Sequence, residues 1–186
     1  NIAAVIVEPM SGSAGAIVPP KGYLQRLREI CDQHDILLIF DEVITGFGRL
    51  GCWTGAEYFG VTPDIMNLAK QITNGAIPMG AVVATSEIYN TFMQQNAPEH
   101  AVEFGHGYTY SGHPVASAVA LENLRILEEE KIVDQVRDVT GPYLKGKWEA
   151  LADHPLVGEA KIVGMMASIA LTPDKASRAP FAADAG

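Results

Sequence analysis

Two uninterrupted apolar runs, separated by an amphipathic segment, constrain the fold of this chain more than any other feature. Residues 2–7 and residues 36–40 are entirely apolar, and each run is followed by a carboxylate. Between them, residues 23–34 carry apolar side chains at helical spacing, namely Leu24, Leu27, Ile30 and Cys31. A strand, an amphipathic helix and a second strand in this order predict a βαβ unit in a parallel sheet.

The rest of the chain continues this alternation. Pro114 begins a long helix, because proline suits the first helical position, where its missing N–H would be unpaired anyway. The other expected elements are a glycine-marked irregular segment at 46–55, strands at 64–68 and 80–85 (the second one buried), a helix at 86–94, a polar loop at 97–107, a helix at 133–151 interrupted at Gly141-Pro142, and a strand with a turn at 157–171.

These elements predict an α/β fold around a mostly parallel sheet. We expect a large domain over residues 1–130, and a linking helix with the start of a smaller second domain over residues 131–186. The chain opens with Asn1 and runs directly into a buried strand. Such a strand needs neighbours on both edges and both faces, so we expect these residues to be part of a longer polypeptide.

Composition excludes several functional classes. The net charge of −9 and the isoelectric point of about 4.9 argue against binding to a nucleic-acid backbone. No signal peptide and no apolar run long enough to span a bilayer is visible. Two cysteines, Cys31 and Cys52, make no disulfide framework and favour a reducing cytoplasm, the alternative being one isolated pair.

Asp41 stands at the carboxyl end of a predicted strand, where open α/β sheets bind ligands. A half-buried carboxylate needs a positive or proton-bearing partner, and a protonated pyridine nitrogen is such a partner. Two structural roles stay open: Asp41 caps the next turn, or it pairs with Arg49. If the backbone stays extended, Val43 shares a side with Asp41 and either packs in the core or lies under an aromatic ring.

Lys70 follows the mostly apolar residues 65–69. Lysine is rarely buried without cause, and apolar surroundings favour its neutral amine. The neutral amine is the form that attacks an aldehyde, so a buried Lys70 would suit Schiff-base chemistry. The alternative is a side chain that extends to solvent.

A third cluster, residues 106–114, leads into the helix that Pro114 begins. Free N–H groups and the helix dipole favour anions at such a position. The hydroxyl of Thr109 or Ser111 could add a hydrogen bond to a phosphate. His106 and His113 have no third ligand at a suitable spacing, so we expect no metal site.

Taken together, these residues resemble the class III (ω-) aminotransferases, pyridoxal 5′-phosphate enzymes of fold type I. The resemblance covers nearly the whole chain to about residue 130, and its motifs lie at residues 7–9, 40–49, 69–80 and 107–114. Residues 60–64 and 98–104 are similar to the ω-amino acid–pyruvate (β-alanine–pyruvate) branch. Ser13 replaces a glutamate that pairs with a substrate-binding arginine in ornithine- and GABA-type relatives, which favours the same branch.

The resemblance implies a three-layer sandwich around the sheet, with the start of a smaller α+β domain at the C-terminal end. Lys70 would be the catalytic Schiff-base lysine, Asp41 would hold the pyridine nitrogen, and Val43 would pack on the ring. Thr109 would bind the phosphate of the cofactor in the neighbouring subunit of a homodimer or tetramer with a shared active site. Glu8 would lie near the cofactor.

The implied activity is ping-pong transfer of an amino group from an ω-amino acid or amine to pyruvate. Alternatives are a class III aminomutase or decarboxylase, or a catalytically incomplete piece of such an enzyme. The family's phosphate cradle and stacking aromatic lie upstream of these residues, and its carboxylate-binding arginine lies downstream. On their own, these residues would therefore form half of a cofactor site.

Overall fold

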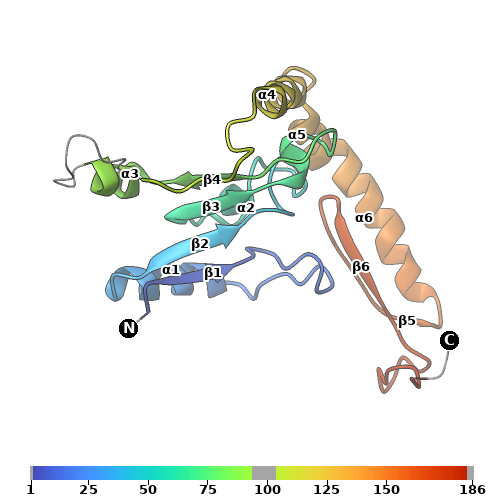
Figure 1. The fold of residues 1–186 in the computed structure, drawn as a ribbon. Helices are drawn as coiled ribbons and strands as arrows, with labels where there is room; N and C mark the ends of the chain where they lie inside the picture. The colour runs from blue at the N-terminus through green and yellow to red at the C-terminus, as the bar shows by residue number, and fades with distance from the viewer. Residues whose placement is uncertain (1, 94–103, 184–186) are drawn as a thin grey trace.

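The computed structural model describes residues 2–93 and 104–183, and its main sheet has four strands (Figure 1). The strands lie in the order β1 (Ala4–Val7), β2 (Leu37–Asp41), β3 (Ile65–Leu68) and β4 (Ala81–Ala84). Strands β1, β2 and β3 are parallel, whereas β4 runs antiparallel to β3. The predicted βαβ unit and the mostly parallel sheet are confirmed.

One face of this sheet is covered by helices. Val7, Phe40 and Met66 lie side by side in the register of β1, β2 and β3, and all three pack toward α1 (Tyr23–Gln33) and α2 (Gly55–Phe59). Both helices contribute to the same core because apolar residues on alternate strand positions point to one face. The buried residues of this core are Leu24, Cys31, Leu38, Phe40, Ala56 and Val61.

The opposite face of the sheet is exposed in the described residues. Ile6, Leu37 and Val82 project there with exposed fractions of 58%, 37% and 70%. The expectation that the strand within 80–85 is buried is wrong: β4 forms, but three of its four residues are exposed. The reason is its position at the edge of the sheet, where Val82 is exposed on one face and Val83, which pairs with Met66, is exposed on the other.

The second half of the chain is largely helical. After α3 (Ser86–Met93), α4 (Pro114–Glu129) begins at its proline as predicted. The segment from Ile132 to Asp153 is then continuous, comprising α5 (Ile132–Gln135), the π-helical η2 (Val136–Thr140), α6 (Gly141–Glu149) and the 3-10 turn η3 (Ala150–Asp153). No described helix has both the length and the hydropathy needed to cross a membrane. Most of the predicted polar loop 97–107 lies outside the described residues.

At the expected interruption, Gly141-Pro142, the helix does not break but continues through the π-helical turn η2 into α6. Proline lacks an N–H and its ring collides with the carbonyl four residues earlier, so a regular helix cannot continue through it. The N–H of Gly141 instead bonds to the oxygen of Val136, five residues back. A Cβ on Gly141 would lie 2.5 Å from that oxygen. Glycine therefore permits the wide turn that carries the helix past Pro142.

The predicted strand and turn at 157–171 is a hairpin of β5 (Val157–Val163) and β6 (Met166–Leu171). Its turn docks on the segment after β2, where Met165 N–H bonds to the Arg49 carbonyl at 2.8 Å. Ser168 Oγ donates to the Gly15 carbonyl at 2.6 Å. A second core joins these parts through Met10, Ala16, Leu50 and Met166.

Candidate active site

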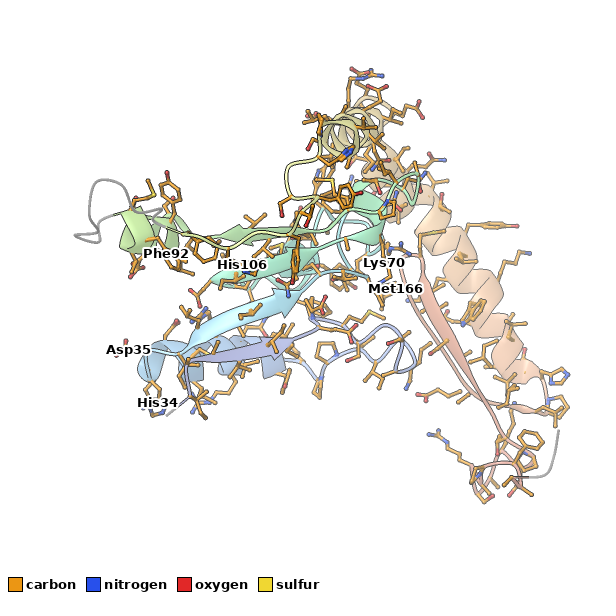
Figure 2. All side chains as sticks on the ribbon, in the orientation of Figure 1. His34, Asp35, Lys70, Phe92, His106 and Met166 are labelled. Atoms are coloured by element: carbon orange, nitrogen blue, oxygen red, sulfur yellow. The ribbon has the colours of Figure 1, made fainter. Side chains whose placement is uncertain are left out.

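The structure brings Asp41 and Lys70 to one edge of the sheet. Asp41 is the last residue of β2 and lies opposite Asn67 of the parallel strand β3. Strand β3 ends at Leu68, and Lys70 begins the 3-10 turn η1 (Lys70–Ile72) just beyond it. Figure 2 shows Lys70 beyond the end of β3, on the side of the sheet where Met166 of the β5–β6 hairpin lies. Both side chains therefore start from the carboxyl ends of adjacent parallel strands.

Asp41 projects from the face opposite to the helices. Its neighbours Phe40 and Glu42 are fully buried on the helix side, and alternation along the strand turns Asp41 the other way. Asp41 Oδ1 accepts a hydrogen bond from Val43 N–H at 3.0 Å, which is the capping role left open by the sequence. The described residues form no ion pair between Asp41 and Arg49 and no hydrogen bond to Asp41 Oδ2.

The position of Val43 differs from the extended arrangement considered from the sequence. Strand β2 ends at Asp41, and Val43 lies in the turn that follows. The half-buried side chain of Val43 is therefore placed by the turn, which the Asp41 cap helps to fix. Because Val43 lies outside the strand, the alternation of side chains along β2 does not place it on the same face as Asp41.

The expectation that Lys70 is buried in apolar surroundings is wrong for this chain. Strand β3 stops at Leu68, so Lys70 lies beyond the sheet and is exposed. Its backbone has a φ of +49°, in the left-handed region that residues other than glycine rarely adopt. Burial of the amine cannot come from the strand itself, because the strand has already ended.

Glu8 and the loop that follows it pack against the segment after Asp41. Glu8 Oε2 accepts a hydrogen bond from Gly12 N–H at 2.9 Å. Gly12 lies so close to Ile44 that a Cβ on the glycine would be 2.6 Å from the Ile44 side chain. The Glu8 carboxylate thus holds a loop that supports the Asp41–Ile44 segment.

Sequence reasoning missed Glu42, which organises the same segment. Its carboxylate is fully buried and accepts hydrogen bonds from the Gly55 and Ala56 amides, both at 2.7 Å, and from the Thr45 hydroxyl. The two amides belong to the first turn of α2, where a negative charge is favoured. A second carboxylate beside Asp41 was the only sequence signal, and its two backbone partners lie more than ten residues away.

Thr109 belongs to a later segment of the chain than the other predicted residues. It is exposed in the turn that precedes α4. Its neighbours Tyr108 and Tyr110 line a cavity of about 450 Å³ together with residues 77–80, but neither Thr109 itself nor the other predicted site residues contribute to it. No group of three side chains able to hold a metal ion occurs in the described part of the chain.

An amine and a carboxylate at one sheet edge fit the two ends of pyridoxal 5′-phosphate. The amine of Lys70 suits the aldehyde, and the carboxylate of Asp41 suits the protonated ring nitrogen. Asp41 Oδ2 accepts no hydrogen bond in the described residues, so it can accept one from that nitrogen. The donor set therefore agrees with the cofactor that the sequence motifs imply.

Comparisons with known proteins point to one family of enzymes. The profile of the family Aminotransferase class-III matches residues 1–186. The beta-alanine–pyruvate aminotransferase of Pseudomonas aeruginosa is 62% identical over 178 residues, covering 93% of this chain and 38% of that protein. The omega-amino acid–pyruvate aminotransferase of Pseudomonas putida is 57% identical over 173 residues, covering 93% and 38%.

A solved structure gives the same fold. The crystal structure of an (S)-enantioselective omega-transaminase from Thermomicrobium roseum superposes with a TM-score of 0.89 at 43% identity, covering 96% of this chain and 39% of that one. The α/β fold of type I is thereby confirmed.

The chain belongs to the class III aminotransferase family. Enzymes of this family depend on pyridoxal 5′-phosphate. The chain spans about 38% of the length of the curated relatives that it matches.

Proposed function

We propose that the protein containing this chain transfers an amino group from an ω-amino acid or amine to pyruvate by a ping-pong transamination. The observation that carries the proposal is the position of Asp41 at the end of β2 and of Lys70 just beyond the end of the adjacent parallel strand β3. Identity of 62% and 57% to two pyruvate aminotransferases supports pyruvate as acceptor. Pyridoxal phosphate, when bound, supplies an electron-withdrawing ring that takes up the electron pair of a broken C–H bond.

Asp41 keeps the proton on the ring nitrogen. Its carboxylate carries the negative charge that favours a protonated pyridine, and the protonated ring withdraws electrons more strongly. The turn that follows β2 orients the carboxylate through the bond from Val43 N–H. Val43, half-buried in this turn, would pack on one face of the ring.

Lys70 moves the proton at the reacting carbon. Its amine would hold the cofactor through the aldehyde group, and the same amine, when free, would act as the general base that takes the substrate proton. Exposure of Lys70 in the described chain supports its access to both aldehyde and substrate. Glu8 holds Gly12 by a hydrogen bond, and Gly12 packs on Ile44, so this loop supports the segment that carries Asp41 and Val43.

Thr109 serves a neighbouring subunit in this proposal. Its hydroxyl is exposed and precedes the N-terminus of α4, which suits a phosphate that reaches it from outside this chain's own site. The active assembly is then a homodimer, or a tetramer built from such dimers. Residues 1–130 belong to the cofactor-binding domain and residues 131–186 to the linking helix and a smaller domain. A cytoplasmic location agrees with the two free cysteines.

An amino-acceptor assay on the full-length protein tests this function. The protein with pyridoxal phosphate should form alanine from pyruvate when β-alanine is the donor. Lys70→Ala should abolish alanine formation, whereas Lys147→Ala, which removes an exposed lysine of α6, should leave it unchanged. An aminomutase or decarboxylase would consume the amine without forming alanine, and that outcome would contradict the proposal.

A further inference from the structure

Lys70 adopts a backbone conformation that its own chemistry does not favour. Its φ of +49° lies in the left-handed region, where asparagine, aspartate and histidine are enriched among residues with a side chain but lysine is not. Such a conformation persists only where surrounding contacts hold it. The direction in which the Lys70 side chain leaves the backbone therefore depends on what fixes the turn after it.

Hydrogen bonds within the turn hold it weakly. Ile72 N–H bonds to the Ala69 carbonyl at 3.2 Å, and Thr73 N–H bonds to the Lys70 carbonyl at 3.4 Å. Both distances lie at or beyond the long end of the normal N–H···O range, as the poorer geometry of a 3-10 turn leads one to expect. Local bonding alone is a weak constraint on a strained residue.

Asn123 on α4 ties the turn to a helix. Its Nδ2 group donates to the Gln71 carbonyl at 2.7 Å and to the Ile72 carbonyl at 3.2 Å. These carbonyls belong to the two residues that directly follow Lys70. Asn123 is itself partly buried, and its helix is anchored by the buried side chains of Ala116, Ala120 and Leu127. A rigid element thus fixes the turn from a distance of about fifty residues along the chain.

We propose that Asn123 is a positioning residue for Lys70. Its amide fixes the η1 turn against α4, and this holds the Lys70 backbone in the conformation that aims the amine at the cofactor. The inference deepens the proposed function and rests on it for the role of the amine. Helix α4 begins just after the turn that carries Thr109. Asn123 therefore connects Lys70 of one active site to the same helix whose N-terminal turn is proposed to bind phosphate in the neighbouring subunit's site.

Two variants of the full-length protein separate this role from general stability. Asn123→Asp keeps the shape of the side chain but places a carboxylate, which cannot donate, against two carbonyl oxygens. Asn123→Ala removes the donor without adding a charge. The matched control is Glu122→Ala, which removes the neighbouring side chain on the same helix, an exposed group that pairs, among the described residues, with Arg125.

The first measurement is amide hydrogen exchange in the cofactor-free proteins. Loss of the Asn123 donor should speed exchange at Thr73 and Asn74 about tenfold, the equivalent of one lost hydrogen bond. Amides of β2 should be unaffected, and Glu122→Ala should match the wild type throughout. Unchanged exchange at Thr73 and Asn74 in both Asn123 variants overturns the inference.

The second measurement uses the cofactor-loaded proteins. Both Asn123 variants should shift the pH at which the visible absorbance of the lysine-bound cofactor changes, and should lower kcat more than they raise KM, by about tenfold. If the wild type binds cofactor at Lys70 and the variants match it in both respects, Asn123 does not position Lys70, and the proposed function stands. If the wild type binds no cofactor at Lys70, the proposed function fails, and hydrogen exchange alone decides whether Asn123 fixes the turn.

Discussion

The carboxylate of Glu42 accepts a hydrogen bond from the backbone amide of Gly55 at 2.7 Å, and neither residue is exposed to solvent. Glu42 directly follows Asp41, the residue proposed to hold the cofactor nitrogen. The Glu42 bonds therefore fix the chain at the point where β2 ends and the turn after Asp41 begins. Gly55 is suited to this contact, because a Cβ there would lie 2.7 Å from the Pro9 ring.

Replacing Glu42 by glutamine should reduce the free energy of unfolding by about 1–3 kcal/mol, because an NH₂ group would then face a buried N–H donor. The measurement is chemical denaturation of the full-length protein. Glu57→Gln is the control: Glu57 also accepts a bond from a backbone amide, that of Trp53, but it is exposed. A change of less than about 0.5 kcal/mol is expected there. Equal effects of the two substitutions would contradict a special role for Glu42.

Asp41→Asn should lower kcat by roughly 100-fold or more, because a neutral amide no longer stabilises the charge on the ring. Asp41→Glu keeps the negative charge and should retain more activity than the asparagine variant. Steady-state kinetics with a saturating amine donor measure both. Full activity of Asp41→Asn in cofactor-loaded protein would remove Asp41 from its proposed role.

Two glycines of the same helix should respond to alanine in opposite directions. Gly141→Ala should destabilise the protein, since its Cβ would collide with the Val136 carbonyl in the π-helical turn. Gly146→Ala in α6 meets open space and should stabilise the protein by about 0.5–1 kcal/mol, the helix propensity difference. Thermal unfolding of the pair measures the contrast. A stabilising Gly141→Ala would show that the π-helical turn is absent in solution.

Burial raises the pKa of the Cys31 thiol above its ordinary value of 9.0. The native protein then keeps the thiol proton at a pH where the unfolded chain loses it, so the stabilising contribution is complete below pH 9 and is lost as the pH rises through the native pKa. The stability gap between wild type and Cys31→Ala should therefore shrink above pH 9. Denaturation at pH 7 and at pH 10 compares the two, and a constant gap would refute this.

The strand ends could be read from the sequence because they depend on local pattern. Apolar runs at 2–7 and 36–40 define parallel strands, and the carboxyl ends of such strands meet at one edge. That rule placed Asp41 at the ligand-binding edge, whereas its pairing with Lys70 came from the family resemblance. It could not give the exposure of Lys70 or of β4, because exposure depends on which neighbours cover the sheet, and a strand pattern does not identify them.

The hydrogen bonds that support the candidate site could not be predicted from the sequence for a related reason. Glu42 meets Gly55 and Ala56, and Asn123 meets Gln71 and Ile72, through tertiary packing rather than through any spacing in the sequence. A single asparagine on a helix carries no signal of this kind. The positive φ of Lys70 also could not be predicted from the sequence, because lysine has no preference for that conformation.

The most direct test of the account is to locate the cofactor chemically. Full-length protein loaded with pyridoxal phosphate is reduced with borohydride, digested and analysed by mass spectrometry. We predict the added cofactor mass on the peptide that contains Lys70, and its loss from that peptide in Lys70→Ala protein. A reduced adduct on another lysine, or no adduct in protein that is folded and saturated with cofactor, would contradict the assignment of this site.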